Sequence, residues 1–373
     1  MREAPYKPTK NIVLSLYYAQ HQSPMPPLLL FFLSILFLFT YSYSSSESIP
    51  FRSELEVNLL FEGWLMKHNK TYKENSFEKA KRYDIFKDNL RYIDEHNGGN
   101  HTFTLFLNVF ADLTVEEYRD TYLGSLPPLP KETVGSNSDI YNDNFDDFGS
   151  EIPNSTDWRA SGAVTPVKHQ GACFCCWAFA AVATVEGINQ IVTGELISLS
   201  VQQIVDCYSK SCDRGYIDDA LKYIRRNGGI DSDVDYPYNA TYEQCDKKKE
   251  GKKVVTIDTY QHLSENNEPR LKMGVAKQPV AVGIHAYERA FQLYGHGIFT
   301  SKCGTRIDHA VTIVGYGNED KLDYWIIKNC WGNFWGEAGY MRLERNVESI
   351  KGKCGIAQYP YIPLKKKKAS SLE

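Results

Sequence analysis

The stretch Trp177–Val192 is apolar at almost every position, and Gly194 follows it closely. A helix that is apolar on nearly every side must be buried, and glycine suits the left-handed residue after a helix end. Three cysteines, Cys173, Cys175 and Cys176, stand directly before the stretch. The pattern predicts a central buried helix with Cys176 at its N-terminus, where free backbone N–H groups and the helix dipole favour the nucleophilic thiolate.

Length and composition predict a folded chain of two or three units. The chain has 373 residues, and a domain usually takes about 100–200. Its 42% hydrophobic and 13% aromatic residues suffice for a substantial core. Because the net charge is −4 and no basic stripe carries interleaved aromatics, we expect no nucleic acid as a partner. The lysine run 365–368 is interpreted as a solvated tail.

The longest apolar run, Leu28–Phe39, is typical of a secretory signal peptide. As a helix it is too short for a hydrocarbon core of about 30 Å, and small polar residues follow at Ser42–Ser48, where cleavage is expected. We assign 1–46 to the signal region, with Met25 as an alternative natural start. A signal anchor that stays in the membrane is the alternative, but no stable membrane anchor is expected.

The expected localisation is the secretory pathway, ending in a vacuole or lysosome or outside the cell. Four glycosylation sequons fit this route, at Asn69, Asn100, Asn154 and Asn239.

The region Ser53–Asn97 is rich in charge and has a helical period. Six residues recur at steps of three and four and so share one helix face. They are Glu78, Arg82, Phe86, Asn89, Ile93 and Asn97. This set resembles the ERFNIN signature in the inhibitory propeptide of papain-like cysteine proteases. The segment Asn108–Asp112 resembles the second motif of that propeptide, although Phe106 stands where the family usually has a glycine turn.

Three further segments resemble the catalytic apparatus of the same family, in its plant-type form. They are Val164–Phe179 (VTPVKHQGACFCCWAF), Ile307–Val311 and Tyr324–Gly332. The resemblance implies that Cys176, His309, Asn329 and Gln170 are catalytic, the last as an oxyanion-hole donor. It also implies that Trp331 covers the His–Asn hydrogen bond, with Trp335 nearby. The expected activity is a cysteine endopeptidase working through a thiolate–imidazolium pair and an acyl-thioester, with neither metal nor other cofactor.

The resemblance further implies an α+β, papain-like two-lobed fold, with a helical lobe and a β-barrel-like lobe, preceded by a helical inhibitory propeptide. We assign the propeptide to 47–125, an activation linker to 126–151, the mature peptidase to 152–364 and a basic and polar tail to 365–373. The first lobe is expected over Trp158–Thr259 and the second over Gln261–Pro360. Short strands are expected at Val280–Ile284, Ala310–Tyr316 and Tyr324–Lys328. The helices of Ser53–Asp112 are expected to hold the zymogen inactive until acidification.

An odd number of cysteines, nine, leaves at least one thiol unpaired. By resemblance, the disulfides are Cys173–Cys212, Cys207–Cys245 and Cys303–Cys354. This leaves Cys175, Cys176 and Cys330, of which Cys330 is interpreted as a small buried hydrophobe in place of the usual serine. A zinc site at 173, 175 and 176 is disfavoured, since these residues cannot converge on one tetrahedron.

Four residues depart from the family pattern near the site. Phe174 replaces a glycine that lines the cleft, and Arg214 replaces a glycine at the substrate edge. Cys175 replaces a serine and could form a vicinal disulfide with Cys176. Val201 replaces an acidic residue.

The resemblance places the substrate-binding residues in the cleft between the lobes. Gly215 is expected to pair with the substrate backbone. The pocket for the residue two before the scissile bond is expected to be apolar, with room at Gly283 for a bulky side chain. The full set of expected substrate-binding residues is Gly215, Tyr216, Ile217, Gly283, Ile307, Asp308 and Trp331. Tyr359 is a further candidate for the lining of the pocket.

Expected partners are peptide and protein substrates, the chain's own propeptide and cystatin-type inhibitors, and the expected state is a monomer. The alternative function is a catalytically impaired homologue that acts as a binding, storage or defence protein.

Overall fold

A computed structural model describes residues 52–125 and 152–366 of the chain. The chain divides into two units, Met1–Pro50 and Phe51–Glu373, and the described residues all belong to the second. The signal region, the linker 126–151 and the tail from 367 onward lie outside them. Within the described part, no helix is both long and apolar enough to span a bilayer.

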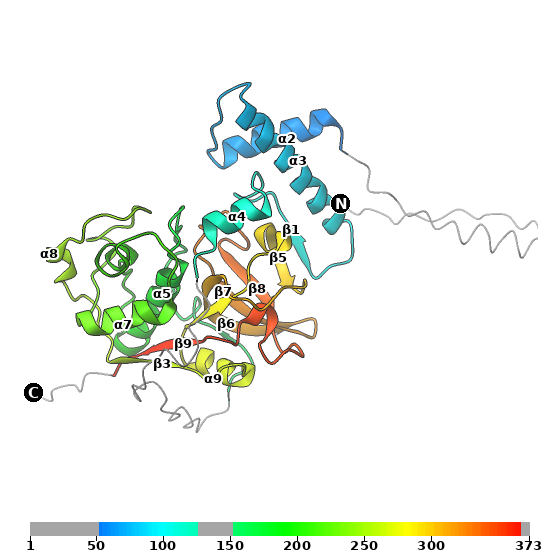
Figure 1. Cartoon of the computed structure of the whole chain (residues 1–373). Coiled ribbons are helices and arrows are strands. Elements are labelled where there is room, and N and C mark those ends of the chain that lie inside the picture. Colours follow the sequence, from blue (N-terminus) through cyan, green and yellow to red (C-terminus); the bar gives the residue numbers. More distant parts are fainter. Residues whose placement is uncertain (1–51, 126–151, 367–373) are drawn as a thin grey trace, which may run out of the picture. The chain divides into compact units, whose positions relative to one another are not determined.

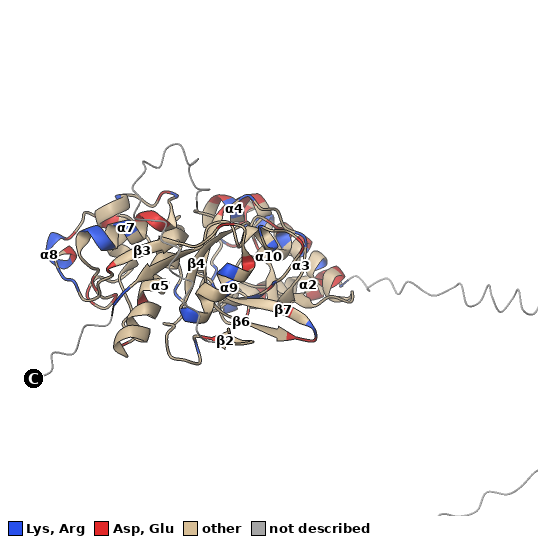
Figure 2. Cartoon of the chain, turned by 90° about the horizontal axis from the view of Figure 1, so that it is seen from below, with Lys and Arg blue, Asp and Glu red and all other residues tan. Residues whose placement is uncertain are grey.

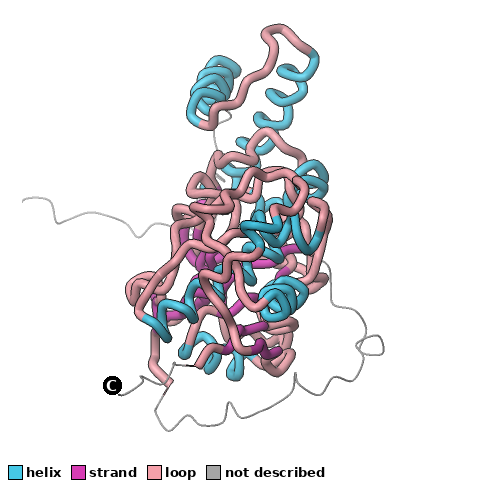
Figure 3. The backbone as a smooth tube through the Cα atoms, turned by 90° about the vertical axis from the view of Figure 1, so that its left-hand side faces the viewer, coloured by secondary structure: helices cyan, strands magenta, loops and turns pink. Residues whose placement is uncertain are grey.

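The segment before the linker begins with two helices that pack on each other. Each starts at a serine whose hydroxyl accepts a hydrogen bond from the helix backbone, and Ser53 completes a capping box with Glu56. Between them lies an apolar cluster that includes Phe61, Trp64 and Phe86. Figures 1 and 3 show this pair at one end of the unit. The elements are α2 (Glu54–Lys67), α3 (Phe77–Asn97), β1 (Phe103–Leu105) and α4 (Val115–Tyr122).

The polar residues on the predicted face of α3 bind the chain that follows it. The Asn89 amide donates to the carbonyls of Ala111 and Leu113 at 2.8 and 3.0 Å. Asn97 donates to Leu105 O and accepts from Leu105 N, both at 2.9 Å. The spacing predicted the common face of these residues, and the structure adds that this face holds the following chain.

Phe106 needs no glycine conformation. It is not among the residues with positive φ, and its N–H donates to Leu293 O at 2.8 Å. Its half-exposed ring lies under the Lys67 ammonium at 4.6 Å. Phe106 therefore fits at the position where the family usually has glycine.

The part of the chain that follows the linker has two halves, and the first of them, up to α8, is mainly helical (Figure 1). Helix α5 is buried along most of its length and ends at Gly194, whose φ is +83° as the sequence predicted. Cys173–Cys212 and Cys207–Cys245 cross-link this half. The elements are β2 (Thr156–Asp157), α5 (Cys176–Thr193), α6 (Val201–Ile204), a π-helical turn (Val205–Ser209), α7 (Ile217–Asn227) and α8 (Lys247–Glu250).

The second half is built on strands. Among the described residues nine strands form one sheet in the order β1-β5-β8-β7-β6-β4-β9-β3, with β2 paired to β6. The elements are β3 (Thr259–His262), α9 (Glu268–Lys277), β4 (Val280–Ile284), α10 (Arg289–Gln292), β5 (Tyr294–Phe299), β6 (His309–Glu319), β7 (Leu322–Lys328), β8 (Tyr340–Glu344), a 3₁₀ turn (Lys353–Gly355) and β9 (Tyr361–Leu364). The three strands expected from sequence are β4 and the greater parts of β6 and β7.

Three strands of this sheet lie wholly outside the expected second lobe, one of them being β2, which pairs with β6. β9 lies beyond Pro360 and pairs with β3 and β4, and β1 comes from before the linker and pairs with β5. The third disulfide, Cys303–Cys354, ties the loops of this half together. Lys and Arg are interspersed with Asp and Glu over helices such as α7, α8 and α4, so these helices carry charges of both signs (Figure 2).

Candidate active site

Cys176 is the first residue of α5, and its side chain is fully buried. Burial is the main influence on the thiol and raises its pKa to about 11, although backbone N–H groups of Ala310, Gly124 and Trp177 act in the opposite direction. Ala310 directly follows His309 at the start of β6. The strand therefore brings the predicted histidine next to the predicted nucleophile.

His309 is held in one orientation by two neighbours. Its Nε2 lies 2.9 Å from Asn329 Oδ1, to which it donates, and Trp331 stacks on its ring at 4.5 Å. Its Nδ1 is buried without a hydrogen-bond partner among the described residues. Burial lowers the pKa of His309 to about 4, despite the Asn329 hydrogen bond and the charge of Asp308. Nδ1 is thus the nitrogen free to accept a proton.

Gln170 is fixed by contacts on both ends of its amide. Its Oε1 accepts from the Cys330 thiol at 2.9 Å, and its Nε2 donates to the carbonyls of Tyr122 and Cys173 at 3.1 and 3.2 Å. Tyr122 belongs to the segment before the linker. The amide predicted to bind an oxyanion therefore binds a carbonyl oxygen of the chain itself.

The segment Tyr122–Ser125 runs through the site. The carbonyl of Gly124 accepts from Gly215 N at 3.2 Å, and Ser125 N donates to Asp308 O at 3.1 Å. A Cβ on Gly124 would lie 2.3 Å from the backbone oxygen of Phe174, so only glycine fits there. Gly215 is also confined, because an added Cβ would lie 2.5 Å from the Trp177 indole.

The Ser53–Asp112 helices, which are predicted to hold the enzyme inactive, are joined in the structure by the residues that follow α4. The residues that reach the thiol and the Gln170 amide are Tyr122–Ser125, which follow α4. Two contacts anchor this segment: Arg289 donates to Asp88 and Asn89 of α3 at 2.6 and 2.9 Å, and Tyr118 of α4 donates to Ala286 O at 3.2 Å.

A pocket lies beside the site, under Ser125. It brings together five predicted residues, Tyr216, Ile217, Gly283, Ile307 and Tyr359, and adds Asp218 and Tyr361. Gly283 was predicted to leave room for a bulky substrate side chain. The Ile307 side chain takes up part of that space, because a Cβ on Gly283 would lie 2.7 Å from Ile307 Cγ2. Asp218 was missed although it directly follows Ile217. Tyr361 was missed because its strand was not expected.

Three of the residues that depart from the family pattern, Phe174, Cys175 and Arg214, contact different neighbours near the site. The Arg214 guanidinium lies 5.5 Å from the Phe174 ring, at the exposed edge of the site. Cys175 is not bonded to Cys176; its thiol lies 3.0 Å from the hydroxyl of Tyr238, which donates to Gln170 O at 2.6 Å. Burial raises the pKa of Cys175 to about 12. Tyr238 was missed because a single tyrosine in a loop carries no sequence signal.

The three disulfides are the pairs that the resemblance implied, and Cys175, Cys176 and Cys330 are free and buried. Residues 152–364 match the model of the papain family of cysteine proteases, and residues 61–118 match the cathepsin propeptide inhibitor domain. The chain belongs to the papain family. It is a cysteine protease with a propeptide inhibitor domain.

Curated papain-family relatives agree over most of the chain. The probable cysteine protease RD21B of Arabidopsis thaliana is 50% identical over 321 residues, covering 84% of this chain and 68% of the relative. The cysteine proteinase RD21A of the same plant is 50% identical over 318 residues, with the same coverage.

Solved structures of family proforms match as well. The proform of the ragweed pollen allergen Amb a 11 has a TM-score of 0.76 at 37% identity, covering 85% of this chain and 97% of that one. The stem bromelain precursor has a TM-score of 0.74 at 38% identity, covering 83% and 99%. The likeness therefore extends over the propeptide and the peptidase together.

Proposed function

We propose that this papain-family protease is an endopeptidase whose nucleophile is Cys176 and whose proton acceptor is His309. The supporting observation is the state of His309. Asn329 binds its Nε2, and its Nδ1 is buried and has no partner in the part of the chain that the structure describes. His309 directly precedes Ala310, whose backbone N–H acts on the Cys176 sulfur. Transfer of the thiol proton to Nδ1 leaves a thiolate and an imidazolium.

The thiolate attacks a substrate carbonyl and forms a carbon–sulfur bond, while the carbonyl electrons move to oxygen. The Gln170 amide and the Cys176 N–H donate to that oxyanion. The carbonyl of Tyr122, which Gln170 now binds, occupies the place of the substrate oxygen. His309 then protonates the leaving amine, and finally activates the water that hydrolyses the thioester.

We propose that the chain is made as a zymogen in which Tyr122–Ser125 excludes substrate. In the closed form His309 has a pKa of about 4, below the usual value of 6.5. The Cys176 thiol, with a pKa of about 11, and the His309 imidazole are therefore both uncharged in the closed form at pH 7, and only an opened site allows the proton to move from sulfur to nitrogen. Three disulfides support an oxidising compartment on the secretory route.

An irreversible epoxide inhibitor of thiol proteases tests this proposal. We expect the acid-matured protein to be labelled at Cys176, because pairing with His309 at a helix N-terminus gives a thiolate near neutral pH. The proenzyme should react far more slowly at pH 7, since a buried thiol with a pKa of about 11 stays protonated. Mass spectrometry locates the label. An unlabelled Cys176 in reduced, matured protein would contradict the proposal and support a binding or storage role.

Substrate preference follows from the pocket beside the site. Because Ile217, Ile307 and aromatic rings line it, we expect a preference for an apolar residue two before the scissile bond. Peptide-library profiling measures this. We expect Gly283→Ala, which presses on Ile307, to shift the preference from leucine or phenylalanine towards valine. A wild-type preference for arginine or aspartate would refute the assignment and point to Asp218 or Arg214 as the dominant contact.

A further inference from the structure

Lys328, the last residue of β7, is a buried cation without an ion-pair partner in the described part of the chain. It is 7% exposed, and its ammonium donates to Thr165 Oγ1 at 2.8 Å. An ammonium has three donors, and a buried charge is costly unless it is paired. Among the described residues, no carboxylate lies within ion-pair distance of the Lys328 ammonium, and only one of its three donors has a partner.

The nearby carboxylate, Glu186, is already engaged at both oxygens. Its Oε2 accepts from Thr165 at 2.6 Å, and its Oε1 accepts from Leu199 N at 2.9 Å and lies 3.6 Å from Lys168 Nζ. Lys168 also lies 3.4 Å from Asp233, which is partly exposed at the surface. One buried carboxylate thus serves two ammonium groups.

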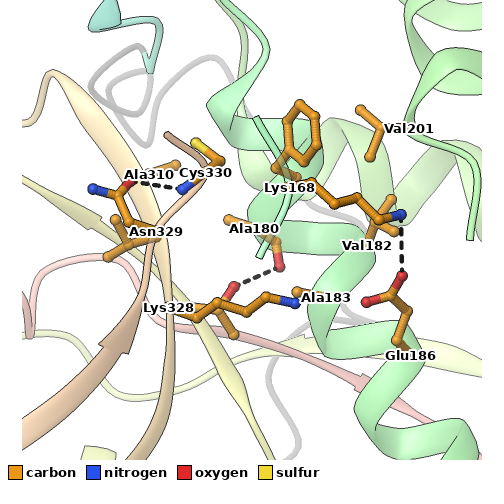
Figure 4. A pocket seen from close by; sticks show the side chains of 13 residues that line it. Lys168, Ala180, Val182, Ala183, Glu186, Val201, Ala310, Lys328, Asn329 and Cys330 are labelled. Carbon is orange, nitrogen blue, oxygen red and sulfur yellow. Dashed lines mark hydrogen bonds and ion pairs between the residues drawn. The ribbon is translucent and has the colours of Figure 1, made fainter. Parts of the chain in front are cut away.

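A cavity adjoins these charges. Lys168, Glu186 and Lys328 line it together with apolar residues that include Phe179 and Val182. Figure 4 shows both lysine side chains extending toward the helix that carries Ala183 and Glu186. The space suits a particle of about the size of water and is too small for an organic molecule.

Val201 forms part of the cavity wall and is fully buried. It stands where the family usually has an acidic residue, so this chain places an isopropyl group beside two lysines. We propose that the cavity binds a chloride-sized monovalent anion, held by the ammonium of Lys328 in the field of Lys168. Burial lowers the pKa of Lys328, and a bound anion would oppose that effect.

An anion in this cavity would lie next to residues that contact the proposed catalytic side chains. Asn329 and Cys330 follow Lys328 directly and also line the cavity. An anion that fixes Lys328 would stabilise the segment that orients His309 and Gln170. The site itself does not depend on the proposed catalytic roles.

Thermal unfolding of the full-length proenzyme tests the proposal. At fixed pH and ionic strength, chloride should raise Tm along a saturating curve by about 2–5 °C relative to gluconate, which is too large to enter. A bound water or a neutral Lys328 would give no such difference. Equal Tm values in the two salts would overturn the proposal.

Two variants of Val201 separate charge from volume. Val201→Glu should lose the chloride dependence and have, in gluconate, a Tm at least as high as that of the wild type in chloride. Val201→Gln adds a side chain of the same size without charge and should be less stable than Val201→Glu. Equal Tm values for the two variants would contradict the charge argument.

A direct observation does not rely on the variants. In crystals of the wild-type proenzyme soaked in bromide, we expect an anomalous peak beside Lys328 Nζ. Peaks only at surface lysines would show adventitious binding and overturn the proposal.

Discussion

Replacing Cys176 by alanine is expected to reduce kcat/KM for a peptide substrate by a factor of about 10⁴ or more. The thiolate forms the covalent intermediate. Because Cys176 and His309 act as one catalytic unit, removing either of them abolishes nearly all of the rate enhancement that the pair provides. For the same reason, Cys176→Ala combined with His309→Ala should be little worse than either change alone. The measurement uses matured enzyme obtained through a cleavage site for another protease inserted between 126 and 151.

The neighbouring thiol supplies the matched control. Cys175 faces the Tyr238 hydroxyl, and serine can keep that hydrogen bond. Cys175→Ser should therefore retain activity within a few-fold of the wild type. If the Cys175 and Cys176 variants lost kcat/KM equally, activity would depend on the integrity of the helix N-terminus rather than on one sulfur. That result would contradict the assignment of Cys176 as the nucleophile.

Replacing Gly124 by leucine is expected to open the proenzyme. An added Cβ would lie 2.3 Å from Phe174 O and 2.6 Å from its carbonyl carbon, and these are backbone atoms that cannot turn aside. Overpacking typically costs about 1–3 kcal/mol, and each 1.4 kcal/mol is a factor of ten. Labelling of Cys176 in the intact proenzyme at pH 7 should accordingly become about 10–100 times faster.

A second glycine of the propeptide serves as the control for this experiment. Gly63 lies within α2, and an added Cβ there meets nothing within 4 Å. Gly63→Ala should leave the labelling rate unchanged or lower it, because alanine favours the helix that anchors the propeptide. If Gly124→Leu is labelled as slowly as the wild type, then Tyr122–Ser125 does not close the site.

The sequence was informative wherever a pattern is local. The apolar run of α5 and its Gly194 end, the polar face of α3 and the strands β4, β6 and β7 follow from periodicities that each segment carries alone. Family resemblance led to Cys176, His309, Asn329 and Gln170, which lie close together in the structure. Family resemblance, rather than periodicity, supplied the cysteine pairs.

Other features depend on segments that meet only after folding. Tyr122–Ser125 has no motif, and its role arises because α4 contacts the loop after β4 and α3 contacts α10. Tyr238 touches Gln170, and β9 returns to pair with β3, through contacts between residues far apart in the chain. The pKa values of Cys176 and His309 likewise depend on burial by several elements at once. A single segment encodes its own periodicity, but such distant contacts and the resulting desolvation exist only when the whole chain has packed.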